Sequence, residues 1–267
     1  MCRLAGAGPR RLPLRLVVAI VLAAMLAGAV IAAAFGDDDG SLPDVVVEWL
    51  GTAEATETPG GPASPPAQLR ATPTRTVVPD EVTGFAYPIA GGCLPESDAL
   101  MPGAERAYRN GQHEGVDFYD SDNCAEVGVD SEVLAAKSGT VTRADWDYVD
   151  LTAETLSVLE ERIAGGDAAN PEIEDAFRGR QVWIGHADGT VTRYAHLNGI
   201  AEGIDVGVKV DVGQLIAYVG DSGTPESVTN PGTEYHLHFE IRVGEAYLGQ
   251  GSSAERIREL YQQAFAP

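Results

Sequence analysis

Hydrophobic and polar positions alternate with a period of two through much of the second half of the chain. Short runs rich in β-branched residues are separated by Gly-rich and Asp-Gly turns. This pattern is typical of antiparallel strands with one buried face. The sequence therefore predicts a mainly β domain over residues 83–251. The clearest predicted strands are Thr140–Thr142, Gln181–Gly185, Thr190–Ala195, Gln214–Val219 and Tyr235–Val243.

Residues 145–180 depart from this pattern and have helical periodicity. Thr152 can cap a first helix that ends at Gly165-Gly166, and Asn170-Pro171 can begin a second. The stretch stands between two predicted core strands, so we interpret it as a helical insertion. It forms either a wall or lid of a substrate groove or a packing element. The inward face of the first helix would consist of Leu156, Leu159 and Ile163.

The last segment, residues 252–267, also has helical periodicity. Ser252 and Glu255 have the spacing of a capping box. The apolar residues that follow fall on one side of a helix, which predicts a structural C-terminal helix. These residues are Ile257, Leu260, Tyr261 and Ala264.

The amino terminus has a different pattern. The 20 residues from Leu16 to Phe35 carry no charge, four arginines precede them, and acids follow. At about 1.5 Å per residue this run spans roughly 30 Å, enough for one transmembrane helix with its amino terminus in the cytoplasm. Residues 1–35 are thus a membrane anchor, or a signal peptide if cleavage occurs near Ala32–Ala34. Residues 36–82, rich in proline, threonine and acids, predict a flexible linker.

Composition narrows the classes of function. The formal net charge is −22 at pH 7, and such an acidic protein repels nucleic-acid phosphates, so we expect no nucleic-acid partner. The sequence does not define an oligomeric state. Cys93 and Cys124 are the two cysteines of the exported part, and an even pair outside the cytoplasm favours a disulfide that brackets His113 and Asp117.

Four of the five histidines fall into three short motifs. The motifs are His113-Glu-Gly-Val-Asp117, Tyr194-Ala-His196-Leu and His236-Leu-His238. Residues two apart in a strand share a face, so His236 and His238 would point into one groove. His113 and Asp117 also lie on one side of their segment, and Gly115 leaves room for an ion between them. Two imidazoles and a carboxylate suit a catalytic zinc with an open fourth position, which predicts a zinc hydrolase site.

The stretches HEGVD, RYAHL and EYHLHFEIR resemble the lysostaphin-type, LytM-like zinc endopeptidases, which cut peptide bonds in bacterial peptidoglycan. The resemblance runs from about Tyr87-Pro88 to Ile241 and is interrupted once, at about 145–180. It implies a two-layer antiparallel β-sheet, a barrel-sandwich-like metallopeptidase domain with a duplicated hybrid motif. The metal would lie in a groove across the sheet.

The resemblance also implies roles for the residues. His113, Asp117 and His238 would hold one Zn²⁺ per chain, and His196 and His236 would be catalytic residues that handle protons, with either one as the general base. His186 lies at a probable hairpin turn and is left out of the site as a structural histidine. Tyr194 shares a strand face with His196 and either points toward substrate or packs.

The sequence therefore predicts a zinc metalloendopeptidase that hydrolyses peptide bonds in peptidoglycan. The expected partners are a peptidoglycan peptide as substrate and the membrane through the N-terminal helix. We expect the bacterial cell envelope, with an extracytoplasmic catalytic domain, or secretion after signal cleavage. The alternative is a membrane-anchored scaffold or activator of other cell-wall hydrolases.

Overall fold

The structure is a computed structural model that describes residues 79–266. The predicted membrane segment and nearly all of the predicted linker lie outside these residues. Within residues 79–266, no helix combines the length and the apolar character needed to cross a membrane. The described part begins with the 3-10 helix η1 (Pro79–Glu81), and Val82 already lies in the hydrophobic core.

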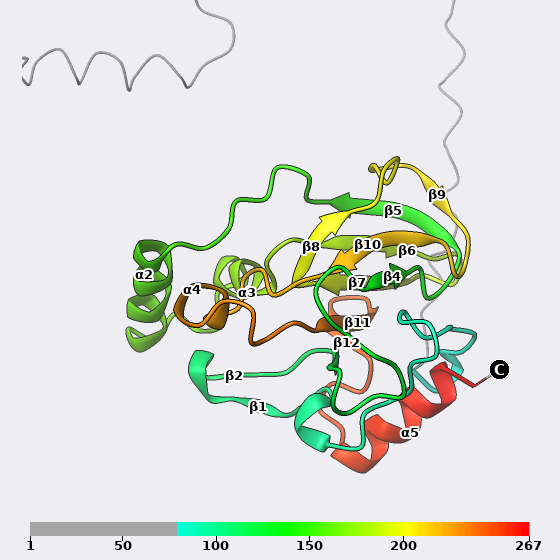
Figure 1. Cartoon of the computed structure of the whole chain (residues 1–267). Helices are drawn as coiled ribbons and strands as arrows, with labels where there is room; N and C mark the ends of the chain where they lie inside the picture. Colours follow the sequence, from blue (N-terminus) through cyan, green and yellow to red (C-terminus); the bar gives the residue numbers. More distant parts are fainter. Residues whose placement is uncertain (1–78, 267) are drawn as a thin grey trace, which may run out of the picture. The chain divides into compact units, whose positions relative to one another are not determined.

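The described part is built mainly from antiparallel strands, as the sequence predicts (Figure 1). One sheet has the order β12-β11-β7-β6-β5-β9, with β3 paired to β11, and a smaller sheet has the order β4-β10-β8. Strands β1 and β2 form a separate hairpin. The strands are β1 (Glu105–Arg106), β2 (Gly111–Gln112), β3 (Val116–Phe118), β4 (Glu132–Leu134), β5 (Gly139–Ala144), β6 (Val182–Gly185), β7 (Thr190–Ala195), β8 (Leu197–Ile200), β9 (Lys209–Val210), β10 (Leu215–Val219), β11 (Leu237–Val243) and β12 (Ala246–Tyr247).

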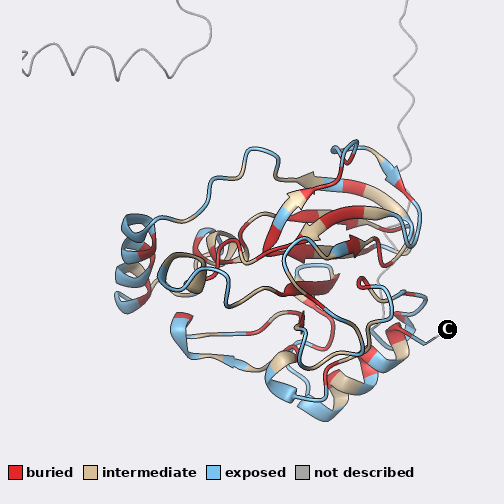
Figure 2. Cartoon of the chain, viewed as in Figure 1, coloured by how far each residue is buried: buried red, intermediate tan, exposed pale blue. Residues whose placement is uncertain are grey.

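All five predicted strands are present, with ends that shift by at most two residues. Inward residues of the two sheets form one core, visible as the buried segments in Figure 2. Its largest fully buried side chains include Tyr194, Phe118 and Phe239. The alternation of buried and exposed residues fails in β11, whose first six residues are all buried. Other parts of the protein therefore cover both faces of β11, including the face that carries the histidines.

The helical insertion is confirmed between β5 and β6, which pair as neighbours. Helix α2 (Ala153–Ala164) begins at Thr152, whose side chain accepts from Thr155 N, and α3 (Pro171–Arg178) begins at Asn170. The two helices share a small core of their own that also contacts Val228 of α4 (Glu226–Thr229). Figure 1 shows these three helices together beside one end of the strands. The residues of the small core are Leu156, Leu159, Ile163, Ile173 and Phe177.

The C-terminal helix α5 (Ala254–Ala264) is present, but its predicted cap is wrong by one residue. Ser253, not Ser252, is the N-cap, and its side chain accepts a hydrogen bond from Arg256 N. Serines at both positions satisfy the local preference, and packing of the apolar face of the helix decides between them. The remaining 3-10 helices are η2 (Asp98–Leu100) and η3 (Ala107–Arg109).

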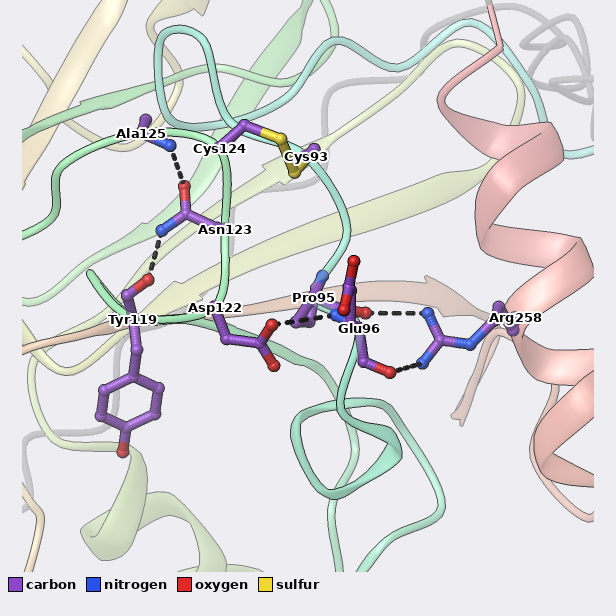
Figure 3. The surroundings of a disulfide bond; sticks show 9 residues. All are labelled: Cys93, Pro95, Glu96, Tyr119, Asp122, Asn123, Cys124, Ala125 and Arg258. Atoms are coloured by element: carbon purple, nitrogen blue, oxygen red, sulfur yellow. Dashed lines mark hydrogen bonds between the residues drawn. A yellow bond between two sulfur atoms is a disulfide. The ribbon is translucent and has the colours of Figure 1, made fainter.

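The predicted disulfide joins Cys93 to Cys124, 31 residues apart (Figure 3). Around it, the carboxylate of Asp122 accepts hydrogen bonds from the backbone of Glu96 and Ser97. Arg258 of α5 donates to the carbonyls of Pro95 and Glu96. The cross-linked segment is therefore bound to the C-terminal helix as well as to itself.

Candidate metal centre

Strand pairing brings the distant motifs together. In the β3–β11 ladder, Asp117 lies directly opposite His238, and on the other side of β11 the partner of His238 is Ala195 of β7. His196 follows immediately, with a left-handed φ of 58° that turns the chain from β7 into β8. His113 precedes β3, and its backbone exchanges hydrogen bonds with Gly103 and Ala104. The antiparallel register thus places all three motifs at one end of β11.

Three side-chain atoms converge at this point. His113 Nε2 lies 2.8 Å from Asp117 Oδ1 and 3.0 Å from His238 Nδ1, and the distance from His238 Nδ1 to Asp117 Oδ1 is 2.8 Å. Tetrahedral ligands around zinc would stand about 3.3 Å apart. The three atoms are a few tenths of an ångström closer, so a small opening would admit the ion. These three residues could therefore hold a metal ion.

Hydrogen bonds orient both of these imidazoles. His113 Nδ1 lies 3.0 Å from the carbonyl of Met101, and His238 Nε2 lies 3.2 Å from Glu240 Oε1. A carbonyl or carboxylate oxygen only accepts, so these nitrogens carry the protons. The lone pairs of His113 Nε2 and His238 Nδ1 therefore face the cluster. This arrangement, with an acceptor behind each ligating imidazole, is common at zinc sites.

The electrostatics of the cluster favour a cation. Burial lowers the pKa of His113 to about 4, which keeps this ring neutral. Burial would also lower the pKa of His238, but contacts with Asp117 and Glu240 outweigh burial and raise it. Burial would raise the pKa of Asp117, yet the neighbouring His113 holds it well below its usual range. Three lone pairs so close together repel one another unless a proton or a metal ion lies among them.

The carboxylate of Asp117 is held from its other side as well. Its Oδ2 atom accepts a hydrogen bond of 2.8 Å from Arg106 of the β1–β2 hairpin, which sequence reasoning missed. Gly115, which the sequence predicts to make room for an ion, makes room in the structure for its two neighbours. A side chain there would lie 2.4 Å from the carbonyl of Phe239 and 2.9 Å from the ring of His238. The glycine instead allows the two strands to approach closely.

His196 and His236 lie beside the cluster. His236 Nδ1 donates to the carbonyl of Glu234 at 2.6 Å, and His196 Nδ1 donates to the carbonyl of Ser222 at 2.8 Å. Each ring is left with a free acceptor at Nε2. His236 Nε2 is 3.9 Å from Asp117 Oδ1. Burial lowers the pKa of His236 and holds that of His196 well below its usual range, so both rings are neutral and can accept a proton.

Tyr119 is a further residue of the site that the motifs do not contain. Its ring stacks on His236 with centroids 4.3 Å apart, and its hydroxyl donates to Glu234 at 2.7 Å. Burial raises the pKa of this phenol far above its usual value, so the hydroxyl stays protonated. Tyr119 and Glu234 together fix the plane of the His236 ring. The sequence signal was its position two residues after Asp117, on the same strand face.

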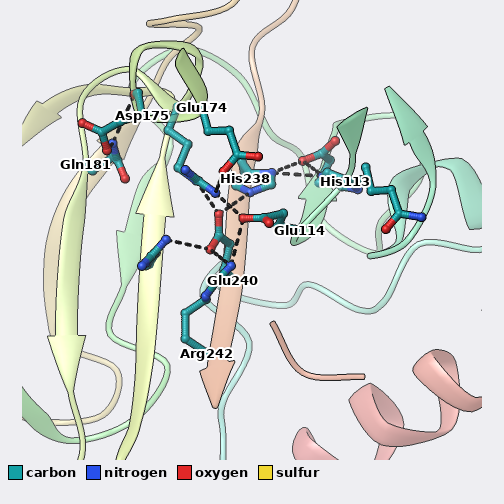
Figure 4. A network of polar contacts seen from close by, with 12 residues as sticks. His113, Glu114, Glu174, Asp175, Gln181, His238, Glu240 and Arg242 are labelled. Carbon is teal, nitrogen blue, oxygen red and sulfur yellow. Dashed lines mark hydrogen bonds and ion pairs between the residues drawn. The ribbon is translucent and has the colours of Figure 1, made fainter. Parts of the chain in front are cut away.

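A cluster of charged side chains lies behind His238 (Figure 4). Glu240, fully buried, accepts from His238 and from Arg178 through Oε1, and from Arg193 and Arg242 through Oε2. Burial would raise the pKa of Glu240, but Arg178 and the other cations hold it well below its usual range. We call the charged side chains behind His238 the charge cluster; they are Glu114, Arg178, Arg193, Glu240 and Arg242. Of its members, Arg178 comes from the insertion.

The site opens into a cavity of about 400 Å³. Its walls come from the metal cluster, from the β1–β2 hairpin and from the insertion. Tyr108 at the hairpin tip contacts Phe177 of α3 with ring centroids 5.6 Å apart. Of the two interpretations of the insertion, a wall of the groove is therefore correct. The insertion residues that line the cavity are Glu160, Glu174, Phe177 and Arg178.

The structure places His186 and Tyr194 outside the cavity. His186 contacts the carbonyl of Ser138 and the hydroxyl of Thr192, as expected for a structural histidine. Tyr194 is fully buried and its hydroxyl accepts from Ala136 N at 2.8 Å, so it packs and does not face substrate.

Comparison with known proteins agrees with the motifs. The model of Peptidase family M23 matches residues 163–250, which include His196, His236 and His238 but neither His113 nor Asp117. The predicted resemblance to LytM-like peptidases is confirmed by this match. No curated protein matches the chain.

Three solved structures are similar to part of the chain. A zinc-containing peptidase from Vibrio cholerae has a TM-score of 0.37 and 21% identity, covering 61% of this chain and 38% of its own. The catalytic domain of lysostaphin from Staphylococcus simulans has a TM-score of 0.34 and 21% identity, covering 60% and 88%. The SpoIIQ-SpoIIIAH pore forming complex has a TM-score of 0.38 and 22% identity, covering 62% and 87%.

Proposed function

We propose that the protein is a zinc metalloendopeptidase that hydrolyses peptide bonds in peptidoglycan. The observation that carries the proposal is the convergence of His113 Nε2, Asp117 Oδ1 and His238 Nδ1 within 3.0 Å. Two further neutral imidazoles stand beside these atoms with free acceptors, which suits hydrolysis better than a purely structural metal site. The match to a peptidase family supports the same reaction class.

Zinc bound by these three residues would polarise the scissile carbonyl and lower the pKa of the attacking water. His236 is the better placed general base, because its Nε2 faces the cluster and its plane is fixed by Tyr119 and Glu234. Once protonated, the same Nε2 can donate to the leaving amine. His196, whose ring centroid lies 4.6 Å from that of His236, provides a second proton acceptor beside it.

We also propose that the catalytic domain works outside the cytoplasm, in the bacterial cell envelope, with the amino terminus as its membrane anchor. The Cys93–Cys124 disulfide supports this, because such bonds persist in oxidising compartments. Intact-mass measurement of the protein recovered from membranes and from the medium separates the two outcomes for residues 1–35. A retained segment supports the anchor, and its loss shows secretion after cleavage.

The activity is tested with purified peptidoglycan and the full chain loaded with zinc. Mass analysis of the released fragments should show new amino and carboxyl termini within the peptide part, and identifies the bond that is cut. Asp117→Asn should lose stoichiometric zinc and release nothing. If the zinc-loaded wild type binds the polymer but releases no fragments, the scaffold alternative is correct and the proposed function is wrong.

A further inference from the structure

One side chain of the insertion reaches the charge cluster behind the metal centre. Arg178, the last residue of α3, donates from Nε to Glu240 Oε1 at 2.6 Å. The same oxygen accepts from His238 Nε2 at 3.2 Å. Arg178 also contacts the carboxylate of Glu114. A continuous path of hydrogen bonds therefore leads from the insertion through Glu240 to an imidazole whose other nitrogen faces the metal cluster.

The two oxygens of Glu240 are used differently. Oε2 is bound by Arg193 at 3.4 Å and by Arg242 at 3.1 Å, and both of these arginines come from the sheet itself. Only Oε1 joins the insertion to His238. The two arginines of the sheet are thus enough to balance the charge of Glu240. Arg178 is needed to fix the position of Oε1.

The main chain at the end of the insertion reaches His196 as well. The carbonyl of Arg178 accepts from His196 N at 2.9 Å. Gly179 packs closely against Ser222, and a Cβ added at Gly179 would lie 2.2 Å from the carbonyl oxygen of Ser222. That carbonyl is the acceptor for His196 Nδ1. The left-handed φ of 58° at His196 is therefore held in place by the residues that close the insertion.

We propose that Arg178 is a positioning residue, through which the insertion sets the orientation of His238 by way of Glu240 and that of His196 by way of its own carbonyl. The inference rests on the proposed zinc centre. It assigns the insertion a role in building the metal site in addition to forming a wall of the cavity. A group that hydrogen-bonds a metal ligand, as Glu240 does His238, typically changes metal affinity by about 10- to 100-fold when it is lost.

The insertion offers a matched control. Asp175, on the same helix, pairs with Arg143 of β5 through two contacts of 2.6 and 3.0 Å. This pair also ties α3 to the sheet, but it does not contact Glu240. Asp175→Asn therefore removes an ionic contact between the insertion and the sheet and leaves the path to His238 intact.

The test uses the full chain and measures zinc affinity by competition with a chelator. Arg178→Leu should bind zinc more weakly than wild type by more than about threefold and by up to the roughly 100-fold expected for loss of Glu240 itself, and Asp175→Asn within about twofold. The visible spectrum of the cobalt-substituted protein should change in Arg178→Leu and not in Asp175→Asn, because it reports the ligand geometry. Thermal unfolding without metal should show a cooperative transition for both variants, so that zinc affinity is compared between folded proteins.

A double-mutant cycle tests the path itself. Glu240→Gln should weaken zinc binding, and adding Arg178→Leu to it should have little further effect, because both changes act on the same contact. If Arg178→Leu does not fold, Arg178→Lys takes its place, with an expected loss of several-fold, since one ammonium cannot serve Glu240 and Glu114 as the guanidinium does.

The measured zinc affinities and the fragment assay decide between the alternatives. Zinc affinity within about threefold of wild type in the Arg178 variant overturns the inference, as does an equal loss in Asp175→Asn. Full additivity of the Arg178 and Glu240 changes also overturns it. Failure of the wild type to bind zinc overturns the zinc centre and with it the proposed function. Zinc binding by the wild type without fragment release leaves the positioning inference standing and overturns only the proposed activity.

Discussion

Removal of the Cys93–Cys124 disulfide should destabilise the fold without removing the metal site. The bond closes a loop with a sequence separation of 31. In the chain-entropy model, a loop of this length contributes about 3.7 kcal/mol to the free energy of unfolding at 25 °C. Cys124 is exposed and Cys93 is half-buried, so replacing the sulfurs with alanine methyl groups removes little packing. Nearly all of the loss should therefore come from the greater freedom of the unfolded chain.

The metal site should respond differently, because its geometry depends on strand pairing. Asp117 is placed by its register with His238, and His113 by backbone hydrogen bonds to Gly103 and Ala104. None of these contacts involves the cysteines. Zinc stoichiometry should therefore remain one per chain in the variant without the disulfide.

The assay compares thermal unfolding of the wild type with that of the double variant Cys93→Ala/Cys124→Ala, both without zinc and without reductant. For a domain of this size, about 3.7 kcal/mol corresponds to a fall in the midpoint of about 7 to 15 °C. Adding a reductant should lower the midpoint of the wild type and leave that of the variant unchanged. A fall of less than about 2 °C would refute the loop-entropy reasoning, and loss of stoichiometric zinc would refute the independence of the site.

Three further predictions follow from the contacts of the site and its surroundings. His236→Gln and His196→Ala should each keep zinc and lose about 10²- to 10⁴-fold in cleavage rate, with the double variant little worse; near-wild-type rates with zinc bound would remove that residue from the mechanism. Stoichiometric zinc should raise the unfolding midpoint of the wild type but not of Asp117→Asn, as scanning calorimetry would show. Partial burial would raise the pKa of Asp188, but Lys137 lowers it to about 2. The ion pair therefore stabilises the fold above about pH 4, and this contribution is lost as the pH falls toward 2. In urea titrations, Asp188→Asn should be less stable than wild type by about 1 kcal/mol at pH 7, and the difference should disappear between about pH 4 and pH 2.

The sequence was a good guide where local rules decide the structure. Strands such as β7 and β10 have the predicted alternation, and both insertion helices begin at their predicted caps, because capping and periodicity act over a few residues. The three histidine motifs could be assigned to one site because each can be recognised from a few neighbouring residues. The convergence of His113, Asp117 and His238 depends on register, which the motifs themselves do not encode.

Sequence reasoning missed the residues that reach the site from a distance. Arg178 lies 62 residues from Glu240, and Arg106 reaches Asp117 from a hairpin whose strands are only two residues long. No local pattern links such pairs. Glu240 did carry a signal, because it stands two residues after His238 on the same strand and so shares the face that the histidines occupy.

The polar face of β11 explains why this signal was easy to misread. His236, His238, Glu240 and Arg242 occupy every second position, and such a face is ordinarily expected to be open to solvent. Here all four are buried, the first two at the cavity and the last two in the charge cluster. Replacing a buried ionic cluster with well-packed apolar residues is often neutral or stabilising, so stability alone does not account for it. Its place behind His238 does, because the carboxylate of Glu240 accepts from His238 Nε2 and holds the imidazole in one orientation, and an apolar packing surface offers the ring nitrogen no partner.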